Sequence, residues 1–247
     1  MKKENKVVVI AEPYWYEGHF ETQMQLFLAL ILPRGCRVIV LCAQPEDIKK
    51  WVMEQYPEYT EALFADHYYL NGGIGRKSLK RGQGWQHLSK VVEKAQRDSG
   101  WRVDLVFITF VDPLVNNSFR TLGVGLKFDY PWVGAYILPE FFRHKSNMIK
   151  RTVQRINHQM IRLMAQGQHI GILDEGVLSA MESAFPEKKL LVLPDVTDER
   201  LPMKTSHTIA NIVAKAGGRP IFGLVGVLKK RKGLLSFLRA VKALDPS

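Results

Sequence analysis

The sequence has few cysteines. Cys36 and Cys42 are the two in 247 residues, so a small fold held together by several disulfides is excluded. Both would lie on or beside one strand with the same side-chain parity, which is poor geometry for a disulfide between them. We therefore expect a reduced, cytoplasmic protein with two thiols in its core.

Long apolar runs are also lacking. The longest, Leu26–Leu32, falls well short of the roughly 20 residues that a membrane-spanning helix needs. The run Val7–Ala11 stops at Glu12 and is too short for a secretory signal. We expect neither a membrane span nor a targeting segment. Metal-ligand spacings are missing too, because the seven histidines are scattered and neither cysteine belongs to a CxxC motif.

Acidic residues are missing from three long tracts. The chain has 35 Lys and Arg against 24 Asp and Glu, a net charge of +11. Residues 67–92, 141–173 and 201–244 contain no acid and together carry +20, which leaves −9 for the rest of the chain. Such segregation indicates an anionic partner: phosphate, acidic lipid or nucleic acid. Nucleic acid is not expected, because the basic tracts are not interleaved with the aromatic residues that base stacking requires.

What the sequence does contain is a regular alternation of strands and helices. β-Branched runs such as Lys6–Ala11 predict strands buried on both faces, and apolar residues at helical spacing, as at Met24, Phe27, Leu28 and Ile31, predict amphipathic helices. The expected strands are 6–11, 37–42, 68–70, 105–110, 132–138, 170–173 and 190–193. The expected helices begin near residue 19 and span 46–56, 86–97, 147–165 and 177–184. This order predicts an α/β fold, a doubly wound parallel sheet with helices on both faces.

The composition changes near Pro194. We predict one complete Rossmann-like domain over residues 1–200, a linker over 201–216 and the truncated start of a second domain over 217–247. In that last range one strand (220–225) and one helix (234–244) are expected, and such a pair cannot bury a core of its own.

Three segments, in this order along the chain, resemble glycosyltransferases of the GT-B, two-Rossmann-domain type, in particular family-4-like enzymes. Gly18–Glu21 together with Leu30–Val40 is similar to the family's opening helix and second strand. Leu191–Asp198 resembles its closing strand and hinge, and Phe222–Gly233 resembles the phosphate loop that opens the donor-side domain. The resemblance implies an acceptor-side N-terminal domain and transfer of a sugar from a nucleotide-sugar donor to an acceptor, with neither a metal nor another cofactor.

The resemblance assigns donor phosphate binding to the turn at Gly226 and to Lys232. A flexible ammonium and backbone N–H groups at a strand-to-helix turn would face an anion, with the helix dipole behind it. Val227 stands where the family usually has an arginine that partners the diphosphate. The alternative interpretation is a solvated basic turn.

The loop after the first strand is a second candidate, because ligands bind at the carboxyl ends of strands in open α/β sheets. Gly18 would let the backbone approach a phosphate or sugar, and Tyr14 and Trp15 could stack on a sugar face. His19 is a further acceptor candidate. The alternatives are a hydrophobic loop that packs over the sheet edge and, for His19, a helix-capping role.

Asp112 follows the expected strand 105–110 and is the predicted catalytic residue, with Thr109 beside it. In the resembling family this loop often carries a residue that faces the acceptor. Asp112 precedes Pro113 and could equally begin a helix as its cap. Glu140, after the next expected strand, is another acceptor-side candidate.

The expected helix 147–165 combines an apolar stripe with a basic stripe that includes Arg151, Arg155 and Arg162. Such a helix could lie on anionic lipid, at about 1 kcal/mol per basic residue near the surface. That would suit a lipid-linked or polysaccharide acceptor at the inner face of the membrane. The alternative is a core-facing helix with a solvated basic face.

A different class of function stays open. Val227 and the lack of the family's acidic-pair motif within the sequence also fit a non-catalytic binding module, a truncated or degenerate relative of the enzymes.

Overall fold

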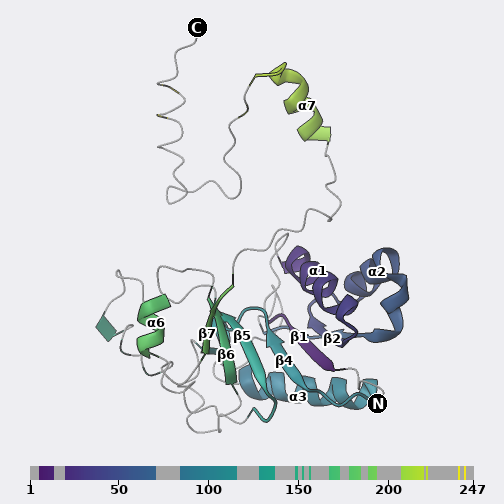
Figure 1. Cartoon of the computed structure of the whole chain (residues 1–247), viewed down its shortest axis with the longest axis vertical. Helices are drawn as coiled ribbons and strands as arrows, with labels where there is room; N and C mark the ends of the chain where they lie inside the picture. The colour runs from purple at the N-terminus through teal and green to yellow at the C-terminus, as the bar shows by residue number, and fades with distance from the viewer. Residues whose placement is uncertain are drawn as a thin grey trace, which may run out of the picture. The chain divides into compact units, whose positions relative to one another are not determined.

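The computed structural model describes residues 6–13, 20–70, 84–115, 128–136, 148–149, 152, 156, 167–172, 178–184, 189–193, 207–219, 221, 239 and 242. The chain divides into two compact units, Met1–Thr197 and Asp198–Ser247. Figure 1 labels most of their helices and strands.

The first unit is built on one sheet of seven strands among the described residues, in the order β3-β2-β1-β4-β5-β6-β7. Every neighbouring pair is parallel. The strands are β1 (Val7–Ala11), β2 (Arg37–Cys42), β3 (Leu63–His67), β4 (Leu105–Ile108), β5 (Trp132–Tyr136), β6 (Gly167–Ile172) and β7 (Lys189–Val192). The predicted doubly wound parallel α/β sheet is confirmed.

Helices cover both faces of this sheet (Figure 1). They are α1 (Phe20–Ile31), α2 (Pro45–Gln55), α3 (Gly84–Ser99), α4 (Asp112–Val115) and α6 (Leu178–Ala184), with short 3₁₀ turns at Leu32–Arg34 and Pro57–Ala62. Successive side chains of each strand point to opposite faces of the sheet. Val9 of β1 packs with the α3 side chains Trp85, Leu88 and Val92, whereas Ile10 packs with buried residues of α1 and α2.

Two helices end where their sequence predicts. Gly35 follows the turn after α1 with φ +76°, and Gly100 follows α3 with φ +70°. This left-handed conformation suits glycine because it has no Cβ, and it ends the helical path. Pro45 opens α2, and Glu46 and Asp47 complement the positive end of its dipole.

The prediction of a strand at 68–70 is wrong. The third strand is β3, one segment earlier, at Leu63–His67. Because β3 lies at the edge of the sheet and pairs with β2 alone, it needs fewer apolar residues than a central strand, and Asp66 and His67 are tolerated in it. The aromatic ring of Tyr68 is buried, but it lies beyond the strand.

Of the expected helix 147–165, the structure describes four residues, all helical: 148, 149, 152 and 156. Ile149 and Ile156, which the periodicity places in the apolar stripe, are exposed, and so is Met148. Arg151, Arg155 and Arg162 lie outside the described residues, so the basic stripe remains a prediction.

In the second unit the structure describes helix α7 (His207–Ala216). This helix falls within the range predicted as a linker, 201–216. Ile209, Ile212 and Val213 follow one another at helical spacing on it and are exposed. Further along, Arg239 and Lys242 are helical.

The sheet order fixes where the chain reverses. From β1 the chain proceeds outward to β2 and β3, then returns to form β4 on the other side of β1. The carboxyl ends of β1 and β4 are therefore neighbours although about a hundred residues separate them. In open α/β sheets this reversal point opens the crevice in which ligands bind.

Candidate functional site at the carboxyl ends of β1 and β4

Three buried polar residues gather at this reversal point. Glu12 directly follows β1, Thr109 directly follows β4, and Asp112 lies three residues further on. Their exposed fractions are 1%, 1% and 2%, and among the described residues no other polar or charged residue is buried. Because burying carboxyl groups and hydroxyl groups is costly, their collection at one place indicates a site rather than chance.

Glu12 and Thr109 are bonded to each other. The Thr109 hydroxyl donates to the Glu12 carboxylate and also lies 3.2 Å from the Ala11 carbonyl oxygen. The backbone holds both residues: Glu12 N–H donates to the Leu41 carbonyl at 2.9 Å, and Thr109 N–H donates to the Ala11 carbonyl at 3.1 Å. The Glu12 backbone is thus held by β2, and its carboxylate is held by the Thr109 hydroxyl at the end of β4.

Asp112 begins the short helix α4, followed by Pro113. This is the position that the helix-start interpretation predicts, and it also places the residue at the carboxyl edge. The turn is anchored on both sides, since Val111 N–H donates to the Ala135 carbonyl at 2.9 Å and Leu114 N–H donates to the Val111 carbonyl at 3.0 Å. These bonds hold the backbone turn in which Asp112 lies.

Cys42, the last residue of β2, lies close to this group. Burial raises the pKa of its thiol to about 12, an effect that the charges of Glu12 and Asp47 reinforce and a backbone hydrogen bond at Gln44 opposes. At neutral pH the thiol is protonated and is not a nucleophile. Cys36 and Cys42 are both free, as their spacing predicts.

Segments that are distant in sequence contact one another at the same carboxyl edge of the sheet. Leu70 N–H donates to the Pro13 carbonyl at 3.1 Å, so the chain leaving β3 runs back to the residue after Glu12. Gly84, at the start of α3, meets α4: a Cβ at Gly84 would lie 2.7 Å from Cδ2 of Leu114. The start of α3 is thereby held against the helix that carries Asp112.

The structure places only some of the predicted site residues. Asp112 and Thr109 are brought to the reversal point together. The other predicted site residues lie outside the described residues, so their predicted roles are untested. They are Gly18, Tyr14, Trp15, His19, Glu140, Gly226 and Lys232. Glu12 was missed as a site residue: it appeared only as the end of an apolar run, although an acid directly after a buried parallel strand is the signal that could have found it.

Two further findings concern the described part of the chain. No group of three or more His, Cys, Asp or Glu residues there could hold a metal ion. No helix there has both the length and the apolar character to cross a bilayer.

The sequence matches no protein-family model and no curated protein. Among solved structures, similar ones include Arabidopsis thaliana UGT89C1 complexed with quercetin (11% identity, TM-score 0.47, 94% of this chain and 61% of that chain). A UGT transferase from Siraitia grosvenorii in complex with UDP has 13% identity and a TM-score of 0.49, over 92% of this chain and 60% of that one. A putative short-chain dehydrogenase from Novosphingobium aromaticivorans has 9% identity and a TM-score of 0.40 over 98% of both chains. This chain thus spans about 60% of the length of the first two, and similarity at this level assigns neither family nor activity.

Proposed function

We propose that this chain belongs to a glycosyltransferase that moves a sugar from a nucleotide-sugar donor to an acceptor hydroxyl, at the carboxyl ends of β1 and β4. The observation that supports the proposal is the buried group Glu12, Thr109 and Asp112 at the point where the strand order reverses. Open α/β sheets bind nucleotides and related ligands at that point. The ordered resemblance in the sequence supports the same chemistry.

Sugar transfer needs a group that receives a proton. The acceptor oxygen forms a bond to the anomeric carbon, the bond from that carbon to the diphosphate oxygen breaks, and the acceptor hydroxyl loses its proton to a base. We assign the base to Asp112, because α4 holds it at the carboxyl edge. Glu12 acts as a positioning residue: its bond to Thr109 ties the end of β1 to the end of β4.

The leaving diphosphate needs positive charge. We propose that Lys232 and the turn at Gly226 supply it, and that Gly18 is a further donor phosphate contact. Tyr14, Trp15, His19 and Glu140 are the proposed acceptor-side or sugar-side contacts. A lipid-linked or polysaccharide acceptor, and membrane contact through Arg151, Arg155 and Arg162, remain predictions of the sequence.

The experiment is a screen of UDP-sugars and GDP-sugars with the full chain, in which release of the nucleoside diphosphate is followed with a panel of acceptors. Once an active donor and acceptor are identified, Asp112→Asn should lower their turnover at least about a hundredfold, because the amide cannot accept the proton. Lys232→Ala should lower it strongly as well. Asp47→Asn, which changes an exposed carboxylate on α2, is the matched control and should leave turnover unchanged.

Urea unfolding of each variant separates loss of chemistry from loss of fold. Near-normal turnover in Asp112→Asn would assign Asp112 to a helix-start role alone. Val227 favours the second candidate function, a binding module. Nucleotide-sugar binding without turnover across the whole panel would support that module and overturn the transfer proposal.

A further inference from the structure

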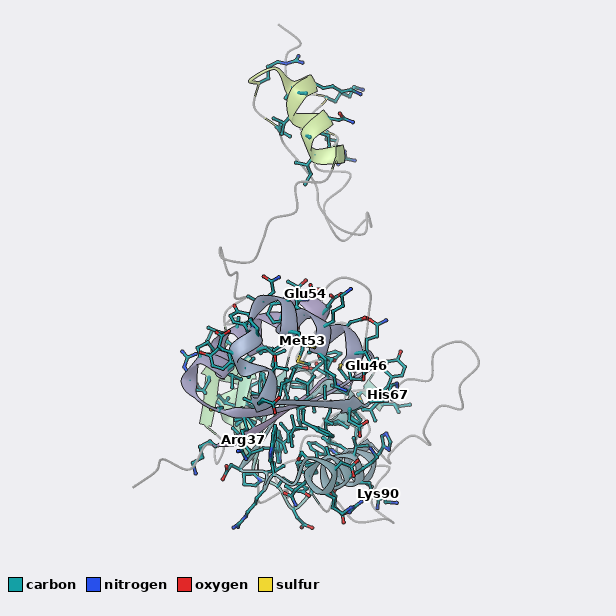
Figure 2. The ribbon with its side chains drawn as sticks, turned by 90° about the vertical axis from the view of Figure 1, so that its right-hand side faces the viewer. Arg37, Glu46, Met53, Glu54, His67 and Lys90 are labelled. Atoms are coloured by element: carbon teal, nitrogen blue, oxygen red, sulfur yellow. The ribbon has the colours of Figure 1, made fainter. Side chains whose placement is uncertain are left out.

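A second group of chemically active side chains lies at the carboxyl end of β3, within the acid-free tract 67–92. His67 is the last residue of β3, and His87 and Lys90 lie one turn apart on α3. The imidazole of His87 stacks on the buried ring of Tyr68, with centroids 5.6 Å apart and an interplanar angle of 29°. Figure 2 labels His67 and Lys90 on the same side of the unit. The Tyr68 ring therefore holds His87 beside the end of β3, one turn of α3 from Lys90.

The charged groups that act on His87 are both basic. Burial lowers the pKa of His87 below its ordinary value, and the charges of Lys90 and His67 lower it further. An imidazole that neighbouring cations keep neutral becomes protonated when an anion offsets their charge. Such a histidine responds to an anion in a way that can be measured.

The carboxylates around this group are already paired with other bases. Asp66 on β3 is bonded to Lys94, which also contacts Asp98 at 2.9 Å, and Glu93 pairs with Arg97 at 2.8 Å. Helix α3 carries no further acid. The Asp66 carboxylate also accepts a hydrogen bond from His67 N–H at 2.8 Å, whereas no carboxylate in the part of the chain that the structure describes forms an ion pair with Lys90. Asp66 therefore offsets part of the charge at His67, and Lys90 is left without a carboxylate partner among the described residues.

We propose that His67, His87 and Lys90 form a subsite that binds a phosphate group. His87 sits in the first turn of α3, where the helix dipole also favours an anion. The Leu70 bond to Pro13 and the contact of Gly84 with Leu114 connect this end of β3 to the carboxyl edge that holds Glu12 and Asp112. A substrate held at that edge could extend a phosphate toward the three bases. The subsite itself does not depend on the proposed sugar transfer.

The test uses sulfate on the full chain at constant ionic strength, because sulfate keeps a charge of −2 throughout the range pH 5 to 8. The His87 imidazole is followed by NMR and is assigned by the signal lost in His87→Gln. Saturating sulfate should raise the pKa of His87, because the anion offsets the charges of Lys90 and His67. Sulfate affinity should fall as the pH rises through that pKa, because the neutral imidazole no longer attracts the anion.

Lys90→Gln should weaken sulfate binding about three- to tenfold, the effect of removing one charge near the anion. Lys50→Gln, which removes an exposed charge from α2, should not. A pKa of His87 that does not respond to sulfate in the unmodified chain would overturn the proposal, and so would equal sulfate affinities in the two lysine variants. The first readout is made on the unmodified chain and needs no enzymatic activity, so its failure is distinct from failure of the transfer proposal.

The phosphate belongs either to a phosphorylated acceptor or to the donor. These two sources are distinguished by measuring the affinities of both lysine variants for glycerol phosphate and for uridine diphosphate. If the subsite serves a phosphorylated acceptor, the two ligands bind with similar affinity and lose the same factor in Lys90→Gln. If it serves the donor, uridine diphosphate binds at least tenfold more tightly and loses that advantage in Lys90→Gln. If Lys90→Gln binds both ligands as tightly as Lys50→Gln does, the proposal is again overturned.

Discussion

The hydrogen bond between Thr109 and Glu12 should be measurable as a coupling free energy. Both side chains are buried, so replacing Thr109 with valine, of nearly the same shape, leaves the Glu12 carboxyl without this donor. A buried polar group that loses its partner costs about 1–3 kcal/mol, more when it is charged. We expect Thr109→Val to lower the free energy of unfolding by about 2–3 kcal/mol.

A double-mutant cycle isolates the pair. Glu12→Met removes the acceptor at similar volume, and the double variant Glu12→Met/Thr109→Val removes both partners. Because replacing both partners costs less than the two single losses together, the cycle should give a coupling of about 1–3 kcal/mol. Urea denaturation at pH 7, followed by tryptophan fluorescence, measures each corner of the cycle.

The matched control is Thr60→Val. The Thr60 hydroxyl donates to the Pro57 carbonyl at 2.9 Å in an exposed bond, so its loss should cost less than about 0.5 kcal/mol. A coupling below about 0.5 kcal/mol, or a Thr109→Val variant no less stable than Thr60→Val, would refute the claim that this bond joins the ends of β1 and β4.

The other predictions concern β5 and the surface of β3. A Cβ at Gly134 would lie 2.9 Å from Cβ of Val111, next to Asp112, so Gly134→Ala should cost about 1–3 kcal/mol of unfolding free energy. Gly171→Ala, whose Cβ would meet Leu193 at an ordinary 3.4 Å, should cost much less, and equal losses would contradict the packing described. Burial opposes ionisation of Asp66, but hydrogen bonds from Lys94 and His67 N–H outweigh it and lower its pKa below 3.8. The ionised Asp66 carboxylate therefore stabilises the fold above pH 3.8. This stabilisation is lost as the pH falls through the lower pKa that Asp66 has in the folded state. Asp66→Asn should therefore be less stable at pH 7 by up to about 1 kcal/mol, a deficit that disappears at acid pH in urea titrations; a deficit that persists there would contradict the assignment.

The strands could be predicted from sequence where burial on both faces demanded apolar runs. β1, β2 and β4 to β6 lie within a few residues of their expected ranges for that reason. β7 also lies close to its expected range because its sequence is apolar, although it is an edge strand in which Leu191 and Val192 are exposed. β3 could not, because an edge strand tolerates Asp66 and His67 while the neighbouring Tyr68 and Tyr69 carry the stronger strand propensity.

The candidate site was predicted in part. Thr109 and Asp112 follow a strand whose end is clear in the sequence, so their position at the carboxyl edge could be inferred. The partnership of Thr109 with Glu12 could not, because it depends on the parallel register that sets Ala11 beside Ile108. The subsite at His67, His87 and Lys90 depends in the same way on the packing of α3 against the end of β3.

The central claim is that the substrate site lies at the carboxyl ends of β1 and β4. Backbone amide NMR shifts during titration with UDP-glucose test it most directly. The account predicts that the amides of Glu12, Thr109 and Asp112 move together, while those of Val7 and Leu105, at the amino ends of the same strands, stay unchanged. Saturable shifts confined to the amino ends, or spread equally over both ends, would contradict it.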